Sequence, residues 1–300
     1  MPMRFSSIAG LFAALLTTAC MASASADGHK GPIAYDDTRP AITEYMKQPA
    51  ILVFSKTRDW RHNEGIAGAD LFFAQLSREQ GYGLFTTVNG AVFNAEDLAR
   101  FEIIVFNNVT GDVLSPEQEA AFQKWLTDGG AWIGIHGSGD NSHGDWPWYA
   151  KSVIGPTFTG HPMNPQFSEA PVVTLAPGHP IMENVPARWL HVEEWYSFDS
   201  LPGEYGLTAL AGLDETAIWP AGKDYPEEKE LRMGNKPADH PIMWTGCIGA
   251  GRLFYSALGH SDEAYENPVN RQILKNSFQW VRKQSDPKGA HCPAKAELAK

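Results

Sequence analysis

This 300-residue sequence contains histidines that follow short apolar segments and a glutamate beside aromatic residues. These side chains could exchange protons. His136 comes directly after the apolar residues 131–135, and His260 comes just after residues 253–258. Glu194 lies in the run Glu-Glu-Trp-Tyr. An imidazole takes up and releases protons near neutral pH, and a carboxylate can orient it or act as a second base. We therefore predict that His136, His260 and Glu194 form a catalytic group with His136 at its centre.

The same residue types also suit a metal ion. His136, His161, Glu194 and His260 would supply imidazole nitrogens and a carboxylate oxygen, which are the usual ligands of zinc. The sequence contains no His-x-His or His-Glu-x-x-His spacing, so each ligand would come from a different segment. A divalent metal such as zinc is therefore an alternative to acid–base catalysis without a metal.

The segments that must position these side chains alternate between strand and helix patterns. Short apolar runs typical of buried parallel strands occupy residues 51–54, 84–88, 103–106 and 131–135. A helical stripe covers residues 63–80 and stops at Gly81, and a second helix begins with Ser115 as its cap and Pro116 in its first turn. This alternation predicts an α/β fold with a mostly parallel central sheet.

Ligands of such a sheet bind beyond the carboxyl ends of its strands. The first strand leads towards His62, the third is followed by Asn108, and the fourth by His136. We therefore expect the polar side chains to meet at one edge of the sheet.

The second half of the chain has a different pattern. Strands separated by Pro- and Gly-rich turns are predicted at residues 171–175, 189–198, 206–210 and 252–258, and a last helix at 268–282. The residues around Cys247 read as a turn. The tail from Ser285 onward is expected to be loose.

The N-terminal residues resemble a secretory signal peptide. Arg4 precedes an apolar run over residues 8–18, and Ala24-Ser25-Ala26 is a small-x-small cleavage site. We predict cleavage after Ala26 and a periplasmic or secreted protein; the alternative is a lipoprotein acylated at Cys20.

These features divide the chain into four parts. They are a signal peptide (1–26), a leader (27–49), one domain (50–284) and a tail (285–300). The net charge of −11 argues against nucleic acid as a partner. After the leader no run of 18 apolar residues occurs, which predicts no permanent membrane anchor. The oligomeric state is left open.

Two cysteines follow the signal peptide. Cys247 and Cys292 could pair in an oxidising compartment and tie the tail to the domain, or remain two free thiols. Cys247 has no neighbouring base in sequence, so a role as a nucleophile is the weakest of the three interpretations.

Taken in order, several short motifs resemble the ThuA-like, or trehalose-utilisation, family over roughly residues 50–283. They are Ser55-Lys56-Thr57 with Trp60-Arg61-His62, the segment Gly129 to His136, Phe158-Thr159-Gly160-His161-Pro162, Gly178-His179-Pro180-Ile181, Glu194-Trp195-Tyr196, Pro241-Ile242-Met243-Trp244, and Gly251 to Tyr255 with Leu258-Gly259-His260. The resemblance implies a flavodoxin-like sandwich of the class I glutamine amidotransferase type. It also implies a link to sugar catabolism, beside dehydrogenases that make 3-keto disaccharides.

The sequence departs from true amidotransferases at the nucleophile. Their cysteine follows a strand ending in Gly-Ile, whereas here Gly134-Ile135 is followed by His136. Ser138 is flanked by glycines but does not complete a Gly-x-Ser-x-Gly motif. Amidotransferase or serine chemistry is therefore not expected.

The resemblance gives the predicted acid–base group a substrate class. The first hypothesis is an enzyme that acts on a disaccharide or 3-keto-glycoside, with His62, Asn108, His161, Tyr196 and Trp244 binding the substrate. Trp60 and Trp195 are further aromatic candidates. The alternatives are a metal-dependent sugar hydrolase or isomerase that uses the same residues, and a non-catalytic carbohydrate-binding protein of the cell envelope.

Overall fold

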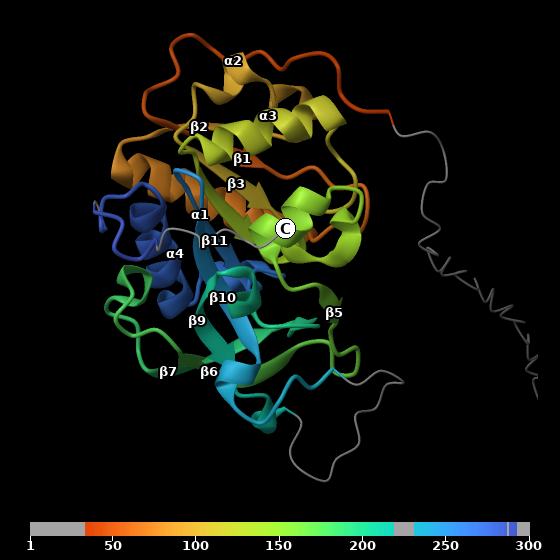
Figure 1. Ribbon diagram of the computed structural model, residues 1–300, viewed down its shortest axis with the longest axis vertical. Helices are drawn as coiled ribbons and strands as arrows, with labels where there is room; N and C mark the ends of the chain where they lie inside the picture. The colour runs from red at the N-terminus through yellow and green to blue at the C-terminus, as the bar shows by residue number, and fades with distance from the viewer. Residues whose placement is uncertain (1–33, 219–230, 287, 293–300) are drawn as a thin grey trace, which may run out of the picture. The chain divides into compact units, whose positions relative to one another are not determined.

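A nine-stranded sheet forms the centre of the computed structural model, which describes residues 34–218, 231–286 and 288–292 (Figure 1). The strand order is β2 (Gly83–Thr87), β1 (Ala50–Phe54), β3 (Ile103–Asn107), β4 (Ala131–Ile135), β11 (Gly251–Ser256), β10 (Pro241–Ile248), β9 (Thr208–Leu213), β6 (Ser168–Thr174) and β7 (Arg188–Glu193). A separate two-stranded sheet pairs β5 (Phe158–Gly160) with β8 (Ser197–Phe198). The predicted signal peptide lies outside the described residues.

The sheet has a parallel half and an antiparallel half. From β2 to β11 every neighbouring pair is parallel, and from β11 to β7 every pair is antiparallel. Strands β9 and β7 therefore point the same way as β11, and only β10 and β6 run against the rest. The predicted α/β class and mostly parallel sheet are confirmed.

Helices cover both faces of the parallel half. These are α1 (Asn63–Gln80), α2 (Ala95–Leu98), α3 (Pro116–Thr127) and α4 (Pro268–Val281). Successive residues of a strand face opposite sides. Phe106 packs on Phe122 of α3 with ring centroids 5.0 Å apart, whereas the next residue, Asn107, donates its amide to the Ile66 carbonyl of α1. Helix α3 therefore lies on one face and α1 on the other.

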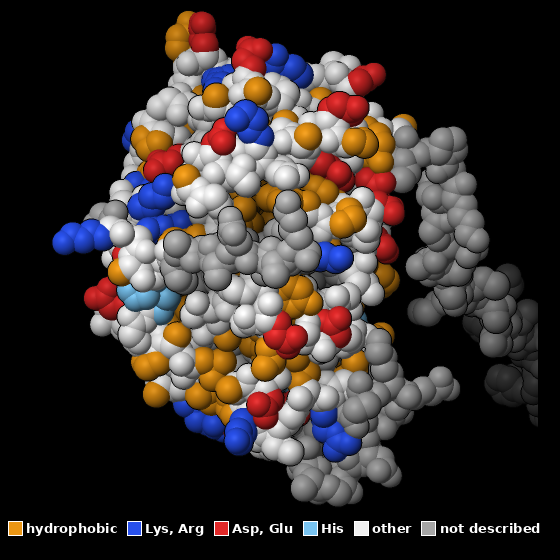
Figure 2. Space-filling view, in the orientation of Figure 1, with side chains coloured by type: hydrophobic (Ala, Val, Ile, Leu, Met, Phe, Trp, Pro, Cys, Tyr) orange, Lys and Arg blue, Asp and Glu red, His pale blue; other side chains and the backbone are white. Residues whose placement is uncertain are grey.

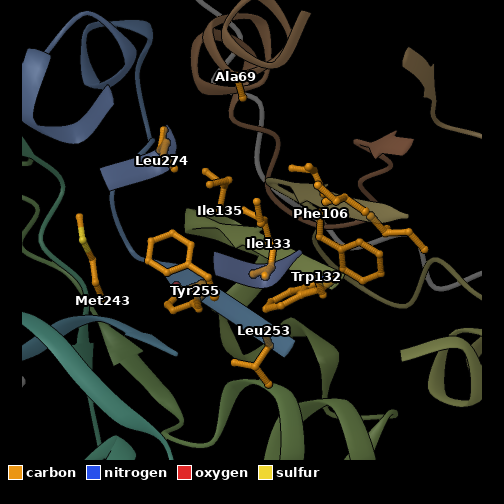
Figure 3. Packing of buried hydrophobic residues seen from close by; sticks show 14 of the residues in the cluster. Ala69, Phe106, Trp132, Ile133, Ile135, Met243, Leu253, Tyr255 and Leu274 are labelled. Atoms are coloured by element: carbon orange, nitrogen blue, oxygen red, sulfur yellow. The ribbon is translucent and has the colours of Figure 1, made fainter. Parts of the chain in front are cut away.

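Helices α1 and α4 lie side by side (Figure 1). Arg271 of α4 donates to the Gln75 side chain of α1, and Lys275 pairs with Glu79 at 3.1 Å. Figure 3 shows the core between these layers, with Ile135 on the side of Ala69 and Leu274. All five residues of β1, β3 and β4 are buried, as expected for central parallel strands.

The predicted ends of the helices α1 and α3 agree with the structure. Gly81 ends α1 in the left-handed conformation (φ 76°), which glycine adopts without a steric penalty. Ser115 caps α3 in a capping box with Gln118, and Pro116 is the first residue of the helix.

Two expectations for the C-terminal part are wrong. Cys247 lies in strand β10, not in a turn; the turn follows at Gly249 and Ala250. The described part of the tail, Asp286 and residues 288–292, is also not loose, because Cys247 and Cys292 form a disulfide with Cα atoms 5.6 Å apart. Arg252 adds a second link by donating to the Asp286 carbonyl at 2.7 Å.

The described part of the chain contains no helix with the length and apolar character needed to cross a membrane. On the face shown in Figure 2, Lys and Arg side chains are scattered among Asp and Glu.

Candidate functional site

Backbone strain marks the sheet edge where the polar side chains meet. His136, directly after β4, has a φ of 43°, and Asn108, directly after β3, has a φ of 54°. Both side chains are completely buried. Non-glycine residues rarely adopt positive φ, and such strained positions concentrate at functional sites. The sharp turn after β4 points the His136 side chain away from the strand, towards the segment that follows β11.

Glu194 is the centre of a cluster of histidines at this edge. Its Oε2 atom lies 2.9 Å from His260 Nδ1 and 3.3 Å from His136 Nε2. Its Oε1 atom lies 3.2 Å from His161 Nδ1 and accepts a hydrogen bond from the Gln166 amide. The Glu194 side chain is only 2% exposed. Both carboxylate oxygens are thus occupied by side chains from three separate segments.

Charge in this buried cluster is balanced by hydrogen bonds. Burial raises the pKa of Glu194, but the close contacts with the His136 and His260 imidazoles lower it more, so its pKa lies far below the ordinary value. Burial lowers the pKa of His136, whereas its hydrogen bond to Glu194 and the charge of Glu193 raise it, with a net rise. Glu194 is therefore a carboxylate, and it attracts positive charge into the cluster.

His136 is held on both sides of its ring. Its Nδ1 atom lies 2.7 Å from the Ala257 carbonyl, which can only accept, so Nδ1 carries the proton. The Tyr196 ring packs against the imidazole with centroids 4.1 Å apart. The hydroxyl of Tyr255 donates to the His136 carbonyl at 2.8 Å. These contacts fix the ring so that Nε2 faces Glu194.

Glu193 positions the segment that carries His260. Its carboxylate accepts hydrogen bonds from the backbone N–H groups of Gly259 at 2.7 Å and His260 at 3.3 Å. Burial raises the pKa of Glu193, but the nearby imidazoles of His191, 3.7 Å away, and His136 give a net lowering. Glu193 therefore acts on His260 through the backbone, whereas its neighbour Glu194 contacts the imidazole directly.

His62 completes the cluster from the start of α1. Its ring lies 4.7 Å from that of His136 and 4.6 Å from that of His260, centroid to centroid. Burial, followed by the nearby charges of His136 and His260, lowers the pKa of His62 to about 2. It is thus a neutral imidazole. Its Nδ1 atom is buried without a hydrogen-bond partner among the described residues.

His161 has the arrangement of a base oriented by a carboxylate. Its Nδ1 atom lies 3.2 Å from Glu194 Oε1 and 3.1 Å from the Pro162 carbonyl. Both neighbours are acceptors, so Nδ1 carries the proton and Nε2 has the free lone pair. The side chain is 23% exposed, more than the other histidines around Glu194.

A pocket of about 170 Å³ opens beside Glu194. Aromatic and apolar side chains share its wall with hydrogen-bonding groups; the lining residues are Trp60, His62, Asp140, Phe158, His161, Met163, Gln166, Glu194 and Tyr196. Trp60 is 60% exposed and so offers its ring to a ligand. Burial raises the pKa of Asp140. Such a mixture of ring faces and polar groups can hold a small polar molecule.

The structure brings together most of the residues predicted for the site. His136, His161, Glu194 and His260 converge as the hypothesis required, and His62 and Tyr196 join them. Asn108 is fully buried away from the pocket: its amide donates to the Gly259 carbonyl and its oxygen accepts from the Gly137 N–H.

The predicted aromatic residues divide into two groups. Trp60 and Tyr196 line the pocket. Trp244 lies in the core, packed between Phe198 and Tyr255, and Trp195 is likewise buried. Trp244 is in the core because it lies in the middle of strand β10, in which every residue except Cys247 is buried.

Some pocket residues were not predicted from the sequence. Met163 and Gln166 come from the connection between β5 and β6, where no pattern distinguishes them from ordinary loop residues, and Phe158 was noted only as part of a family motif. Asp140 could have been found, because it follows the same strand as His136.

The mostly parallel sheet, with a histidine–glutamate cluster at the carboxyl ends of its strands, has the class I glutamine amidotransferase-like fold. The family model "ThuA: Trehalose utilisation" matches residues 50–281, and the chain belongs to this family.

Solved structures of ThuA-like proteins share the fold. One from Bacteroides uniformis has a TM-score of 0.65 at 22% identity, covering 81% of this chain and 95% of its own. Another from Parabacteroides merdae has a TM-score of 0.56 at 16% identity, covering 78% and 89%. A search of curated proteins finds no match.

Proposed function

We propose that this protein is an enzyme that acts on a carbohydrate, a disaccharide or a 3-keto-glycoside, by acid–base chemistry at the pocket beside Glu194. The observation that carries the proposal is the pair formed by His161 and Glu194 in the pocket wall, with a hydrogen-bonding distance of 3.2 Å. The family description, trehalose utilisation, supports a carbohydrate as the substrate.

The shape of the pocket suits one sugar ring. A sugar has apolar C–H faces that pack on aromatic rings and hydroxyl groups that need hydrogen-bond partners. Trp60 and Tyr196 supply ring faces, and Asp140 and Gln166 supply polar atoms. A volume of about 170 Å³ accommodates a single ring, so the rest of a disaccharide would extend past the exposed Trp60.

His161 is the group that exchanges a proton with the substrate. Its Nδ1–H faces two acceptors, the Pro162 carbonyl at 3.1 Å and Glu194 at 3.2 Å, so Nε2 can accept a proton, and the nearby carboxylate stabilises the imidazolium that forms. In a 3-keto-glycoside the carbonyl acidifies the neighbouring C–H bonds. His161 would take a proton from such a carbon, and its imidazolium would then return a proton, exchangeable with water in the meantime, to a carbon or oxygen of the enolised sugar. No other reactant is consumed in this exchange.

The proposal includes export from the cytoplasm. The disulfide between Cys247 and Cys292 supports it, because disulfides persist in the periplasm and outside the cell and are rare in reducing compartments. The N-terminal signal pattern supports it from the sequence. Cell fractionation tests export, and recovery of the protein in the cytoplasm alone would contradict it. The intact mass tests the cleavage site: a chain beginning at Asp27 agrees with cleavage after Ala26, and a lipidated Cys20 does not.

Proton exchange tests the enzymatic part. Trehalose and its 3-keto derivative are incubated with the protein in D₂O and followed by NMR. We expect deuterium to enter the keto sugar, or a product to form, with the wild type. His161→Asn should reduce the rate by about 10²- to 10⁴-fold, the usual contribution of a positioned acid or base.

The matched control is His291→Asn, which replaces a histidine outside the pocket. It should keep the wild-type rate. Sugar binding without exchange or turnover in the wild type would overturn the enzymatic proposal in favour of a carbohydrate-binding protein.

A further inference from the structure

Three atoms of the cluster around Glu194 form a triangle whose contacts cannot all be hydrogen bonds. His136 Nε2, His260 Nδ1 and Glu194 Oε2 are separated by 3.2, 2.9 and 3.3 Å. The carboxylate oxygen can only accept, so each imidazole nitrogen would need to donate to it. The two nitrogens would then face each other with a hydrogen on each.

If His136 is instead neutral, a different one of the three contacts is unfavourable. Nδ1 of His136 already carries a proton for the Ala257 carbonyl, so the neutral ring has a bare lone pair on Nε2. His260 can then donate to His136, but His136 Nε2 and Glu194 Oε2 become two acceptors at 3.3 Å. Protons alone therefore leave one repulsive contact in a fully buried place, and such contacts are costly.

A single cation among the three atoms satisfies every contact at once. We propose that His136, Glu194 and His260 bind a divalent transition-metal ion, zinc or its close relatives, with His62 as a fourth donor within reach. Ligands of a tetrahedral zinc ion, bonded at about 2.0–2.1 Å, lie roughly 3.3 Å apart. The three observed separations are close to this value.

His62 provides an independent observation. Its donor atom lies within 4.8 Å of those of the other three residues, and its buried Nδ1 lacks a hydrogen-bond partner among the described residues. A buried histidine with an unpaired nitrogen is unexplained by packing alone. As a ligand, or through a water on the metal, this imidazole would be satisfied.

The surroundings have the second layer that metal sites require. Ligating histidines usually donate their other N–H to a carbonyl or carboxylate, which fixes the ring. His136 does so to Ala257, and Glu193 holds the backbone at His260. Gln166 and His161 take the second oxygen of Glu194. Each protein ligand is therefore oriented before the ion binds.

The ion would polarise a carbonyl or hydroxyl oxygen of a ligand in the pocket. His161 is not among the proposed ligands and stays free to move a proton. This chemical role depends on the proposed function, whereas the binding of the ion depends on the geometry alone.

Metal binding is measured on the untagged full chain after dialysis against a chelator. Zinc is added, and the bound metal is determined by mass spectrometry and titration calorimetry; cobalt(II) replaces zinc for absorption spectroscopy. We expect about one ion per chain and the visible bands of a low-coordinate cobalt site with nitrogen and oxygen ligands. Glu194→Gln and His260→Asn should each weaken binding by at least about 100-fold, since loss of outer partners alone costs 10- to 100-fold.

Two variants control for misfolding and for zinc binding outside the cluster. His260 is partly exposed, so His260→Asn keeps the fold if the buried Glu194→Gln does not. His291→Asn alters a partly exposed histidine outside the cluster and should bind zinc as the wild type does.

Absence of stoichiometric binding, or equal binding by the site variants and the control, would overturn the inference. Zinc binding without sugar turnover would support the metal site and remove the proposed function. If turnover survives complete removal of the metal and the chelated protein does not rebind zinc, the metal site is overturned and the proposed function is supported.

Discussion

Gly65 in the first turn of α1 controls the position of His260 without carrying any functional group. A Cβ atom at this residue would lie 2.2 Å from the Gly259 carbonyl oxygen and 2.6 Å from that of His260. Both obstacles are backbone atoms, so no side chain can rotate away. Contacts below 3.0 Å are not tolerated, and Gly65→Ala must therefore separate the helix from this segment by at least 3.0 − 2.2 = 0.8 Å.

The size of the effect follows from the bonds that this shift breaks. Gly259 and His260 donate their N–H groups to the buried carboxylate of Glu193 at 2.7 and 3.3 Å. A hydrogen bond to a charged group contributes about 1.5–3 kcal/mol, and overpacking costs about 1–3 kcal/mol. Alanine favours a helix over glycine by about 1 kcal/mol. We expect Gly65→Ala to lower the free energy of unfolding by about 2–4 kcal/mol.

Urea unfolding, turnover and zinc binding of the variant measure the consequences. The displaced His260 should weaken zinc binding and reduce turnover, although no titratable group has changed. Gly178→Ala is the control, because its Cβ would meet nothing within 4 Å. A Gly65→Ala protein that is as stable as the wild type and binds zinc equally well would refute the reasoning.

Three further predictions concern separate parts of the molecule. Trp60→Ala should raise the KM for the sugar by about 3- to 10-fold with an unchanged melting temperature, because an exposed ring contributes about 0.5–1.5 kcal/mol; an unchanged KM in steady-state kinetics would argue against stacking. Replacing Cys247 and Cys292 by alanine should lower the free energy of urea unfolding by about 4 kcal/mol, since the disulfide closes a loop with a sequence separation of 45; a loss below about 1 kcal/mol would contradict this. Burial, with a smaller effect of His291, lowers the pKa of His179 to about 4. As the pH falls, the unfolded chain therefore binds a proton at this residue before the folded protein does, and the free energy of unfolding falls by up to about 3 kcal/mol between pH 6.5 and 4. His179→Asn should flatten this slope, and an identical pH dependence would speak against it.

Local patterns were sufficient for most of the fold. The apolar runs of β1, β3 and β4 and the caps of α1 and α3 act over a few residues, and the sequence predicts them within one or two positions. Strand β10 was missed because Pro241 and Gly246 resemble turn residues. Pro241 is the first residue of the strand, where proline is tolerated, and Gly246 leaves room for the Leu207 side chain, 2.5 Å from where its Cβ would be.

The site depends on contacts between distant segments, which limits what the sequence can show. His136 and His260 were predicted because both follow strands of the parallel half. The disulfide remained an open alternative, since nothing local shows that Cys247 and Cys292 come together. Gln166 contacts Glu194 from a loop without any pattern. Trp244 and Trp60 are chemically equivalent in the sequence, and only the structure shows which one is exposed.

The central claim is that Glu194 organises a catalytic site for a carbohydrate. Turnover of 3-keto-trehalose by Glu194→Gln tests it most directly, because glutamine has nearly the same shape and replaces the charged carboxylate by a neutral amide. We predict a loss of at least about 10²-fold in the rate, in protein that retains the wild-type circular dichroism spectrum. A correctly folded Glu194→Gln protein with the wild-type rate would contradict the account.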